Sequence, residues 1–324
     1  MFRPALLPIR HWHRPLLIAT ALMALATVLS LAGLALDDRV LRGEPIWGKP
    51  LKFAVSLLLY LPTWAWMLSL QQKRRRWTWW TATVIAVLVT VEVVIIVFQV
   101  VRGQGSHFNN GTPFDAALFR LMGSMITLAW LLNMVQGIAL LKDRLPDRPM
   151  AWAIRGGIVL GSVGIGLAFL MTGPTADQLQ VLQQGLHQPV IGAHSVGVPD
   201  GGPGMPLTGW SLTGGDLRIP HFIGIHAMQA LPLLALLLGI AGRRRPRLAD
   251  PLTRSRLVWL GTGTYAGIIA LVTWQALRGQ SIAAPDGWTL AALGVLVVGT
   301  AALAGVILRR APAGLPEPEL VTTR

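Results

Sequence analysis

The chain has 324 residues, of which 53% are apolar and only 13% are charged, and it contains no cysteine. An ordinary soluble domain carries about 25% charged residues, so this composition excludes a disordered chain, a disulfide-stapled secreted domain and a cysteine-ligated metal site. The mean hydropathy of +0.55 makes an all-α polytopic membrane protein the expected class.

Eight apolar stretches are long enough to cross a bilayer, whose hydrocarbon core needs about 20 helical residues. The first stretch is not followed by a small-residue cleavage site, so we interpret it as a true span and not as a signal peptide. The predicted spans are residues 15–36, 50–70, 77–101, 114–141, 151–172, 219–241, 256–277 and 287–309.

The distribution of lysine and arginine between the loops predicts the orientation of these spans. With the N-terminus in the cytoplasm, the inner segments hold 19 Lys and Arg residues and the outer segments hold 6. Topology therefore explains the net charge of +14, and no nucleic-acid partner is expected. We predict an integral protein of a bacterial cytoplasmic (inner) membrane, surrounded by the lipid bilayer, with both termini in the cytoplasm.

Two repeated patterns in the sequence predict that the protein consists of two similar halves. Span three ends with Gln-Val-Val-Arg-Gly-Gln at 99–104, and span seven ends with Gln-Ala-Leu-Arg-Gly-Gln at 275–280. The prolines Pro50 and Pro62 of span two are repeated with the same 12-residue spacing in span six. A duplication of four spans would relate the halves by an axis along the membrane normal. The predicted organisation is a cytoplasmic flank at 1–14, two halves at 15–149 and 150–310, and a cytoplasmic tail at 311–324.

The second half contains a predicted outer loop of 46 residues at 173–218. Thr175 and Gln178 fit a capping box, which predicts a short helix with a leucine-rich apolar face. From residue 192 to residue 215 there are eight glycines in 24 residues, a composition typical of turns. A loop of this length is usually disordered or functional, and its low charge favours a folded cap.

Polar side chains inside membrane spans are costly and usually mark a pathway or a binding site. Here they gather in the predicted outer half of the membrane, which indicates a polar chamber that opens to the outside. We expect residues 192–216 to form its roof, and Glu92 and His226 to lie near its floor. The candidate ligand-binding residues are Glu92, Gln99, Arg102, Asp115, Arg120, Lys52, Asp216 and Gln229.

Several of these residues also have a purely structural interpretation. Glu92 would hold helices together if it paired with Arg120 or Lys52. Asp115 follows a threonine and a proline, a position where an acid stabilises the start of a helix. Lys49 and Lys52 would extend towards the headgroups at the end of span two.

Histidines on the outer side support an alternative function, a membrane-embedded enzyme or redox protein that binds zinc or haem. Catalytic zinc takes three protein ligands and keeps one open position. The candidate metal ligands are His107, His194, His221 and His226. An offset of five places the last two about 140° apart on a regular helix, so they would not share one metal there. Four spans duplicated to eight resemble the haem A synthase architecture in topology, although this chain has no Glu-x-x-His-Arg motif and lacks the second histidine-bearing span of each half.

The function we favour from the sequence is binding of a small molecule or ion from the extracytoplasmic side, in a transporter. A structural or assembly subunit whose outer loop binds a partner protein is the third hypothesis. An inward-facing polar site distinguishes the first hypothesis from the third, which needs an exposed apolar loop surface.

Overall fold

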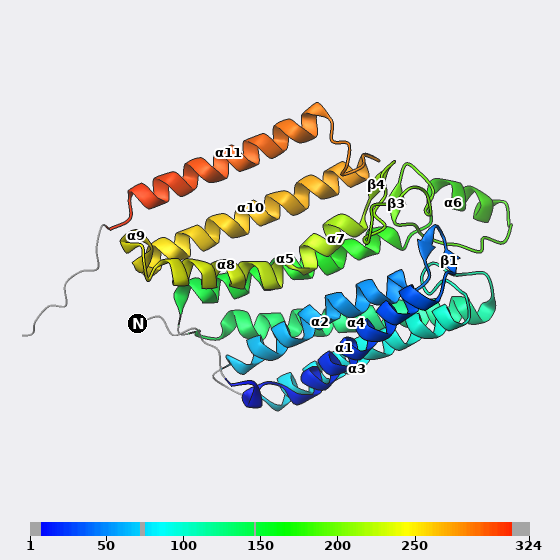
Figure 1. Ribbon diagram of the computed structural model, residues 1–324, viewed down its shortest axis with the longest axis horizontal. Coiled ribbons are helices and arrows are strands. Elements are labelled where there is room, and N and C mark those ends of the chain that lie inside the picture. Colours follow the sequence, from blue (N-terminus) through cyan, green and yellow to red (C-terminus); the bar gives the residue numbers. More distant parts are fainter. Residues whose placement is uncertain (1–7, 72–74, 146, 313–324) are drawn as a thin grey trace, which may run out of the picture.

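A computed structural model describes residues 8–71, 75–145 and 147–312. Most of the predicted tail, and half of the predicted N-terminal flank, lie outside these ranges. The structure is almost entirely helical, with two short two-stranded sheets at one end (Figure 1). The helices are α1 (Arg14–Leu36), α2 (Gly48–Ser69), α3 (Arg76–Val101), α4 (Pro113–Lys142), α5 (Arg148–Leu167), α6 (Ala176–Gln183), α7 (Arg218–Ile225), α8 (Ala227–Ala241), α9 (Pro246–Ala249), α10 (Pro251–Leu277) and α11 (Gly287–Arg309), with 3-10 turns at Ile9–His11 and Ala168–Met171.

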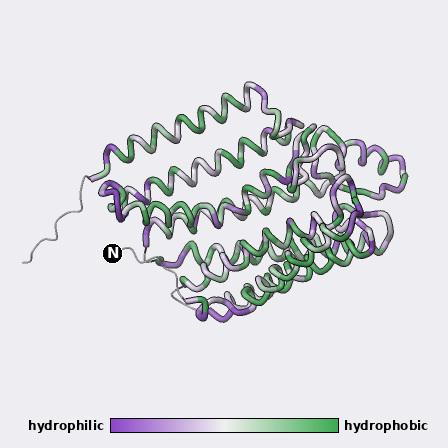
Figure 2. Tube along the Cα trace, in the orientation of Figure 1, coloured by the Kyte–Doolittle hydropathy of each residue, from purple (hydrophilic) through white to green (hydrophobic). Residues whose placement is uncertain are grey.

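Seven described helices are long and apolar enough to cross a membrane, and the bent pair α7 and α8 would make an eighth span. Their positions agree with the stretches predicted from hydropathy, because runs of about 20 apolar residues need a helix to satisfy the backbone in lipid. Figure 2 shows apolar residues along the helices and hydrophilic residues mainly at their ends and in the loops. The molecule therefore has the form of a membrane-embedded helical bundle.

Span six contains two prolines, which allow a kink, and it is broken at His226 and bent by 45°. The Tyr265 hydroxyl on α10 donates to the carbonyl of Ile223 at 2.7 Å. In an unbroken helix that carbonyl would accept the N–H four residues later. Capture of a helical carbonyl by a side chain from a neighbouring helix is one of the recognised causes of a kink.

The helices of the bundle lie in two groups, α1 to α4 on one side and α5, α7, α8, α10 and α11 on the other (Figure 1). In the first group α1 packs on α2 and α3, and α3 packs on α2 and α4. In the second group α5 packs on α8 and α10, and α10 packs on α8 and α11. The groups meet where α4 packs on α5 and where α2 packs on α8. The division into two halves at 15–149 and 150–310, and their origin by duplication, stay predictions.

The two repeated hexapeptides adopt the same turn. Each helix ends before a glycine with positive φ, +71° at Gly103 and +70° at Gly279, a conformation that favours glycine. The side-chain amide of Gln99 donates to the carbonyl six residues later at 3.4 Å. The amide of Gln275 makes the equivalent bond at 2.9 Å. The similarity between 99–104 and 275–280 thus extends from sequence to hydrogen bonding.

One end of the bundle, which we call the loop end, carries all the described β structure. The strands β1 (Val40–Leu41) and β2 (Glu44–Pro45) form one hairpin, and β3 (Ser195–Val196) pairs with β4 (Gly215–Asp216). The predicted capping box is present at the start of α6. The glycine-rich segment is folded against the bundle and is not an extended tether (Figure 1).

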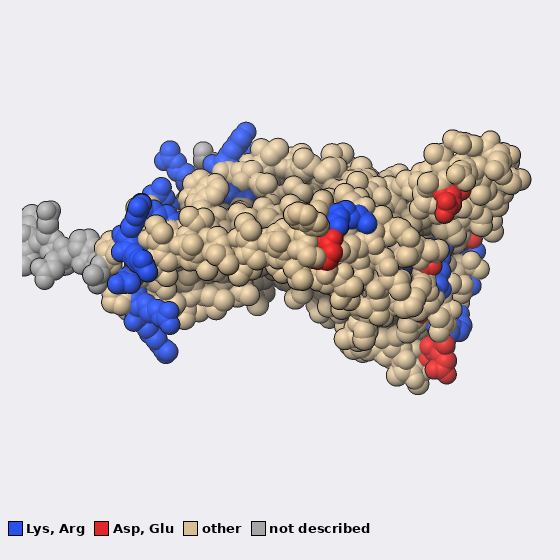
Figure 3. Space-filling view, turned by 90° about the horizontal axis from the view of Figure 1, so that it is seen from above, with Lys and Arg blue, Asp and Glu red and all other residues tan. Residues whose placement is uncertain are grey.

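The opposite end, which we call the basic end, carries a concentration of Lys and Arg side chains (Figure 3). It includes Arg76 at the start of α3, Lys142 at the end of α4 and Arg309 at the end of α11. The loop end carries acidic and basic side chains together (Figure 3). This asymmetry is the pattern that the positive-inside rule describes.

Candidate functional site

The site is organised around Glu92, which lies on α3 in the part nearer the loop end and is only 3% exposed. Its Oε1 atom lies 3.9 Å from Nε2 of His107. Its buried Oε2 atom has no hydrogen-bond partner among the described residues. An unsatisfied buried polar atom costs about 1–3 kcal/mol, and more when it is charged. Glu92 is therefore a group whose hydrogen-bonding capacity is not used by the fold.

His107 lies in the loop between α3 and α4 and presents its ring to Glu92. Aromatic rings surround it, including that of Phe53 on α2 at 5.4 Å between centroids. Its Nδ1 atom lies 3.1 Å from the hydroxyl of Ser106. Burial lowers the pKa of His107 well below 6.5, and the nearby charges of Lys49 and Arg42 lower it further. The imidazole is therefore neutral near pH 7 and offers one free nitrogen towards Glu92.

Lys49 completes this group, which we call the central cluster: Lys49, Glu92 and His107. Lys49 is the second residue of α2 and is half-buried. It lies within electrostatic reach of both Glu92 and His107. It makes no hydrogen bond or ion pair with any part of the chain that the structure describes. Sequence reasoning missed Lys49 as a site residue, because a lysine at a helix end is usually interpreted as extending towards the headgroups.

One face of α2 lines the site. Lys49, Phe53 and Ser56 are spaced by four and three residues, so they project from the same side of the helix. The Ser56 hydroxyl lies 3.2 Å from Nε2 of His226, at the break between α7 and α8. The side-chain amide of Gln229 on α8 donates to the carbonyl of Leu59 on α2 at 3.4 Å. These contacts extend the polar surface from the central cluster to the boundary between the two halves.

A network of four charges, which we call the bridging network, closes the loop end above the cluster. It consists of Glu44, Lys52, Asp216 and Arg218. The Glu44 carboxylate lies 2.5 Å from the Lys52 amine on α2 and 2.9 Å from the Arg218 guanidinium on α7. Arg218 also lies 2.6 Å from Asp216 on β4. Burial raises the pKa of Glu44, but hydrogen bonds and charge from Lys52 and Arg218 outweigh burial and leave it below its ordinary value.

The bridging network also holds the glycine-rich segment in place. Lys52 donates to the carbonyl of Thr208 at 2.9 Å, and Arg218 donates to the carbonyl of Gly209 at 2.5 Å. Gly209 has φ +64°, and a Cβ atom there would lie 2.0 Å from the Glu44 carboxylate. Earlier in the same segment, Asp200 accepts a hydrogen bond from the ring of His194 at 2.9 Å. The predicted roof is thus bonded to residues of both halves.

Three other predicted ligand residues form a separate cluster that joins α3 to α4. Arg102 lies 2.7 Å from Asp115, which also accepts from the amide of Gln99 at 2.9 Å and from the hydroxyl of Thr112 at 2.7 Å. Asp115 is 2% exposed and has its oxygen atoms occupied. The structural interpretation of Asp115 as a helix-capping acid therefore fits these contacts.

The two helix-pairing alternatives for Glu92 are not what the structure shows. Lys52 pairs with Glu44 instead. Arg120 is exposed on α4, and its side chain makes no hydrogen bond or ion pair within the described ranges. The sequence places both cations at a depth in the membrane similar to that of Glu92. Lys52, however, has a closer acid at the hairpin, and Arg120 lies on the outward face of its helix.

The four histidines considered as metal ligands lie in separate places. His107 faces Glu92, His194 bonds Asp200, and His226 bonds Ser56. The ring of His221 lies 2.8 Å from the carbonyl of Gly164 on α5. Among the residues that the structure describes, no three His, Cys, Asp or Glu side chains converge on a point that could hold a metal ion. The donor set for zinc is therefore not assembled in this arrangement.

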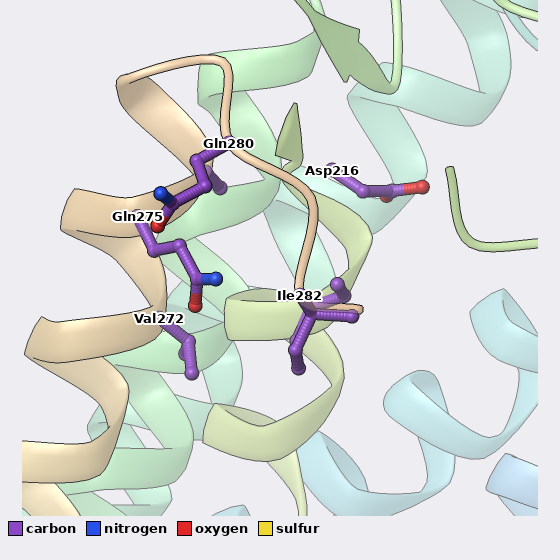
Figure 4. A pocket seen from close by; sticks show the side chains of 7 residues that line it. Asp216, Val272, Gln275, Gln280 and Ile282 are labelled. Carbon is purple, nitrogen blue, oxygen red and sulfur yellow. The ribbon is translucent and has the colours of Figure 1, made fainter. Parts of the chain in front are cut away.

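A small crevice lies beside the bridging network, between the end of α10 and β4 (Figure 4). It is too narrow to admit a water molecule. Figure 4 shows Gln275, Gln280 and Asp216 around it, together with the apolar side chains of Val272 and Ile282. Since the Gln275 amide is already bonded within its turn, the crevice is a packing feature of the repeated turn and not a ligand site.

Comparison of this chain with family models, with curated proteins and with solved structures found no match. No activity, cofactor or residue role is therefore transferred to it from another protein. Its own residues place a buried carboxyl group and an unpaired amine beside a neutral imidazole, beneath a cap that is bonded to both halves.

Proposed function

We propose that this protein is a multi-pass membrane protein that binds a small polar or charged ligand at the central cluster and transports it. One observation carries the proposal: Glu92 is buried with one carboxyl oxygen unpaired, and the half-buried Lys49 near it makes no hydrogen bond or ion pair among the described residues. A purely structural pair would be in direct contact, because an unpaired charge away from water is strongly unfavourable. Arg102 and Asp115, at 2.7 Å, are an example of such a pair in the same molecule.

The charge asymmetry supports access from outside the cell. Under the positive-inside rule the basic end lies in the cytoplasm, and the loop end then faces the extracytoplasmic side of an inner membrane. The central cluster lies nearer the loop end, directly below the bridging network. The ligand would therefore enter past the bridging network and the glycine-rich cap.

Contacts between the halves support a two-fold arrangement around the site. Ser56 and His226 differ by the same 170 positions as the repeated prolines Pro50 and Pro220, and they are hydrogen-bonded to each other. Leu59 and Gln229, again 170 apart, are bonded as well. Equivalent positions meet in this way only next to a two-fold axis. Binding between repeated halves, beside a broken helix, is a common transporter plan.

Cysteine labelling tests the proposal, since the native chain has no cysteine of its own. Ser56 lies eight residues into α2, about 12 Å along the helix from its loop-end start. We expect S56C in intact cells to react with a membrane-impermeant methanethiosulfonate added from outside. The control is A54C on the same helix, where the native side chain is fully buried, and it should stay unlabelled. An S56C variant that is folded but unreactive from outside would exclude the proposed ligand path.

A further inference from the structure

The charges at the loop end can be accounted for almost completely by local pairs. Apart from Glu92, every buried or half-buried acid at the loop end has a charged or histidine partner within hydrogen-bond distance in the described ranges. These acids are Asp37, Glu44, Asp115, Asp200, Asp216 and Asp286. Glu92 differs from them, since its nearest charged-type partner is the neutral ring of His107 at 3.9 Å. Glu92 is therefore the buried acid at the loop end that still has an oxygen available to accept a hydrogen bond from a ligand.

Lys49 is the corresponding cation. The positive charges of Arg42, Lys52 and Arg218 all act on it, and Glu44 is the acid that acts on it most. Glu44, however, is already bonded to both Lys52 and Arg218. The surroundings of the Lys49 amine are therefore electropositive, and such a place favours an anionic group that supplies the missing acceptor.

Glu92 and Lys49 lie near each other without making an ion pair. Glu92 and Lys49 are within electrostatic reach, but no ion pair within 4 Å joins them in the part of the chain that the structure describes. Phe53, one turn below Lys49 on α2, packs its ring against that of His107. Lys49 and Phe53 share one side of α2, Phe53 packs on His107, and His107 lies 3.9 Å from Glu92. These neighbours connect a cation at one end to a carboxyl group at the other.

We propose that the central cluster binds a small zwitterion that carries a carboxylate and a protonated amine. The Lys49 amine would donate to the carboxylate of the ligand. Glu92 would accept from the ligand amine, and Nε2 of His107 would accept from it when Nδ1 donates to Ser106. The inference rests on the proposed function, and it names the chemical class of the ligand. A simple anion would leave Glu92 unsatisfied, and a simple amine would leave Lys49 unsatisfied.

Binding to the purified full-length protein in detergent tests the inference. The probes are glycine and γ-aminobutyrate as zwitterions of two lengths, acetate and methylamine as their half-molecules, and inorganic phosphate as a plain anion. We expect one of the zwitterions to raise the Tm and to bind in equilibrium dialysis, with the half-molecules at least about 10-fold weaker. Loss of one charge-assisted hydrogen bond weakens binding by about 10- to 100-fold.

Substitutions at Lys49 and Glu92 test the carboxylate-binding end and the amine-binding end of the site separately. K49Q should weaken zwitterion and acetate together, whereas E92Q should weaken the zwitterion and leave acetate unchanged. R120Q is the matched control, because it removes an outer-half cation that lies on the exposed face of α4, and its binding should equal that of the native protein.

The outcomes distinguish the inference from the proposed function. If phosphate or acetate binds as tightly as the zwitterions or more tightly, the ligand of the central cluster is a plain anion and the zwitterion class is wrong. Absence of binding by every probe, with S56C still labelled from outside, would overturn the zwitterion class and leave the outer ligand path standing. If S56C is not labelled either, the ligand path itself is wrong.

Discussion

The Glu44 carboxylate is bonded at the same time to Lys52 of the first half and to Arg218 of the second half, at 2.5 and 2.9 Å. The second of these bonds joins residues 174 positions apart. One acid in a short hairpin therefore ties the two halves together at the end where the ligand would enter.

Substitution E44Q should loosen this connection. Glutamine keeps the shape of the side chain but leaves Lys52 and Arg218 without their shared anion, and we expect a loss of about 1–3 kcal/mol in the free energy of unfolding. Differential scanning fluorimetry and denaturant titration in detergent measure it. The control is D38N, which changes an exposed acid next to the same hairpin that makes no side-chain hydrogen bond or ion pair among the described residues, and it should cost much less. Equal losses in the two variants would show that Glu44 has no special connecting role.

Substitutions E92Q and D115N should have opposite effects on stability. Asp115 is buried and holds Arg102, Gln99 and Thr112, so D115N should cost about 1–3 kcal/mol, as when a buried hydrogen-bonded group loses its partners. E92Q removes a buried carboxyl group that has an unpaired oxygen and should leave the Tm unchanged or raise it. Unfolding of E92Q would assign Glu92 a structural role and not a ligand-binding one.

The cap should become less stable in acid because of His194. Burial lowers the pKa of His194 to about 4, although its bond to Asp200 acts in the opposite direction. Since this folded-state pKa lies below the ordinary 6.5, the stability is complete above about pH 6.5 and is lost as the pH falls towards about 4. The shift in the pKa of His194 corresponds to a loss of about 3 kcal/mol in folding stability over this pH range. Hydrogen exchange of residues 192–216 measures it.

The charges that face His194 come from several elements, namely Lys49, Arg218 and Asp200. Asp200 has a pKa below its ordinary 3.8, so its own titration falls at lower pH than this window. H187Q is the matched control, because it changes an exposed histidine of the same loop and should keep the acid-induced transition. A cap whose protection does not change between pH 6.5 and 4 would contradict this role of His194.

The close approach of α5 and α7 should tolerate no added side chain. A Cβ atom on Gly164 would lie 2.3 Å from the backbone of Gly224 and Ile225, and backbone atoms on both sides leave nothing flexible to move. We expect G164A to lower the Tm strongly, because overpacking of this kind costs about 1–3 kcal/mol or more. G123A, at a helical position with open space around it, should be neutral or stabilising by up to about 1 kcal/mol. Thermal melts of the two variants compare them directly.

The membrane-spanning helices could be predicted from the sequence, because the requirement for about 20 apolar residues is local. Pro220 and Pro232 allow a kink in span six, but its position at His226 could not be predicted, since the hydroxyl of Tyr265 lies 42 positions from the carbonyl that it captures. The same limit applies to the site. Glu92 is conspicuous in an apolar span, whereas Lys49 becomes a site residue only because the hairpin supplies Glu44 to Lys52 and leaves Lys49 without an acid.

The way the two groups of helices meet has a mechanical consequence. α4 and α5 are consecutive in the chain and pack together along one margin of the contact between the groups. α11, the counterpart of α4, packs on α10 and has a fully exposed apolar window. Because α4 and α5 are also joined by a short connection, we expect one group to rotate relative to the other about the α4–α5 contact. Such a rotation needs no change inside either group of helices. It would separate Glu44 from Arg218 and Ser56 from His226. It would also separate Lys52 from Thr208 and Gln229 from Leu59, so these polar contacts resist the rotation.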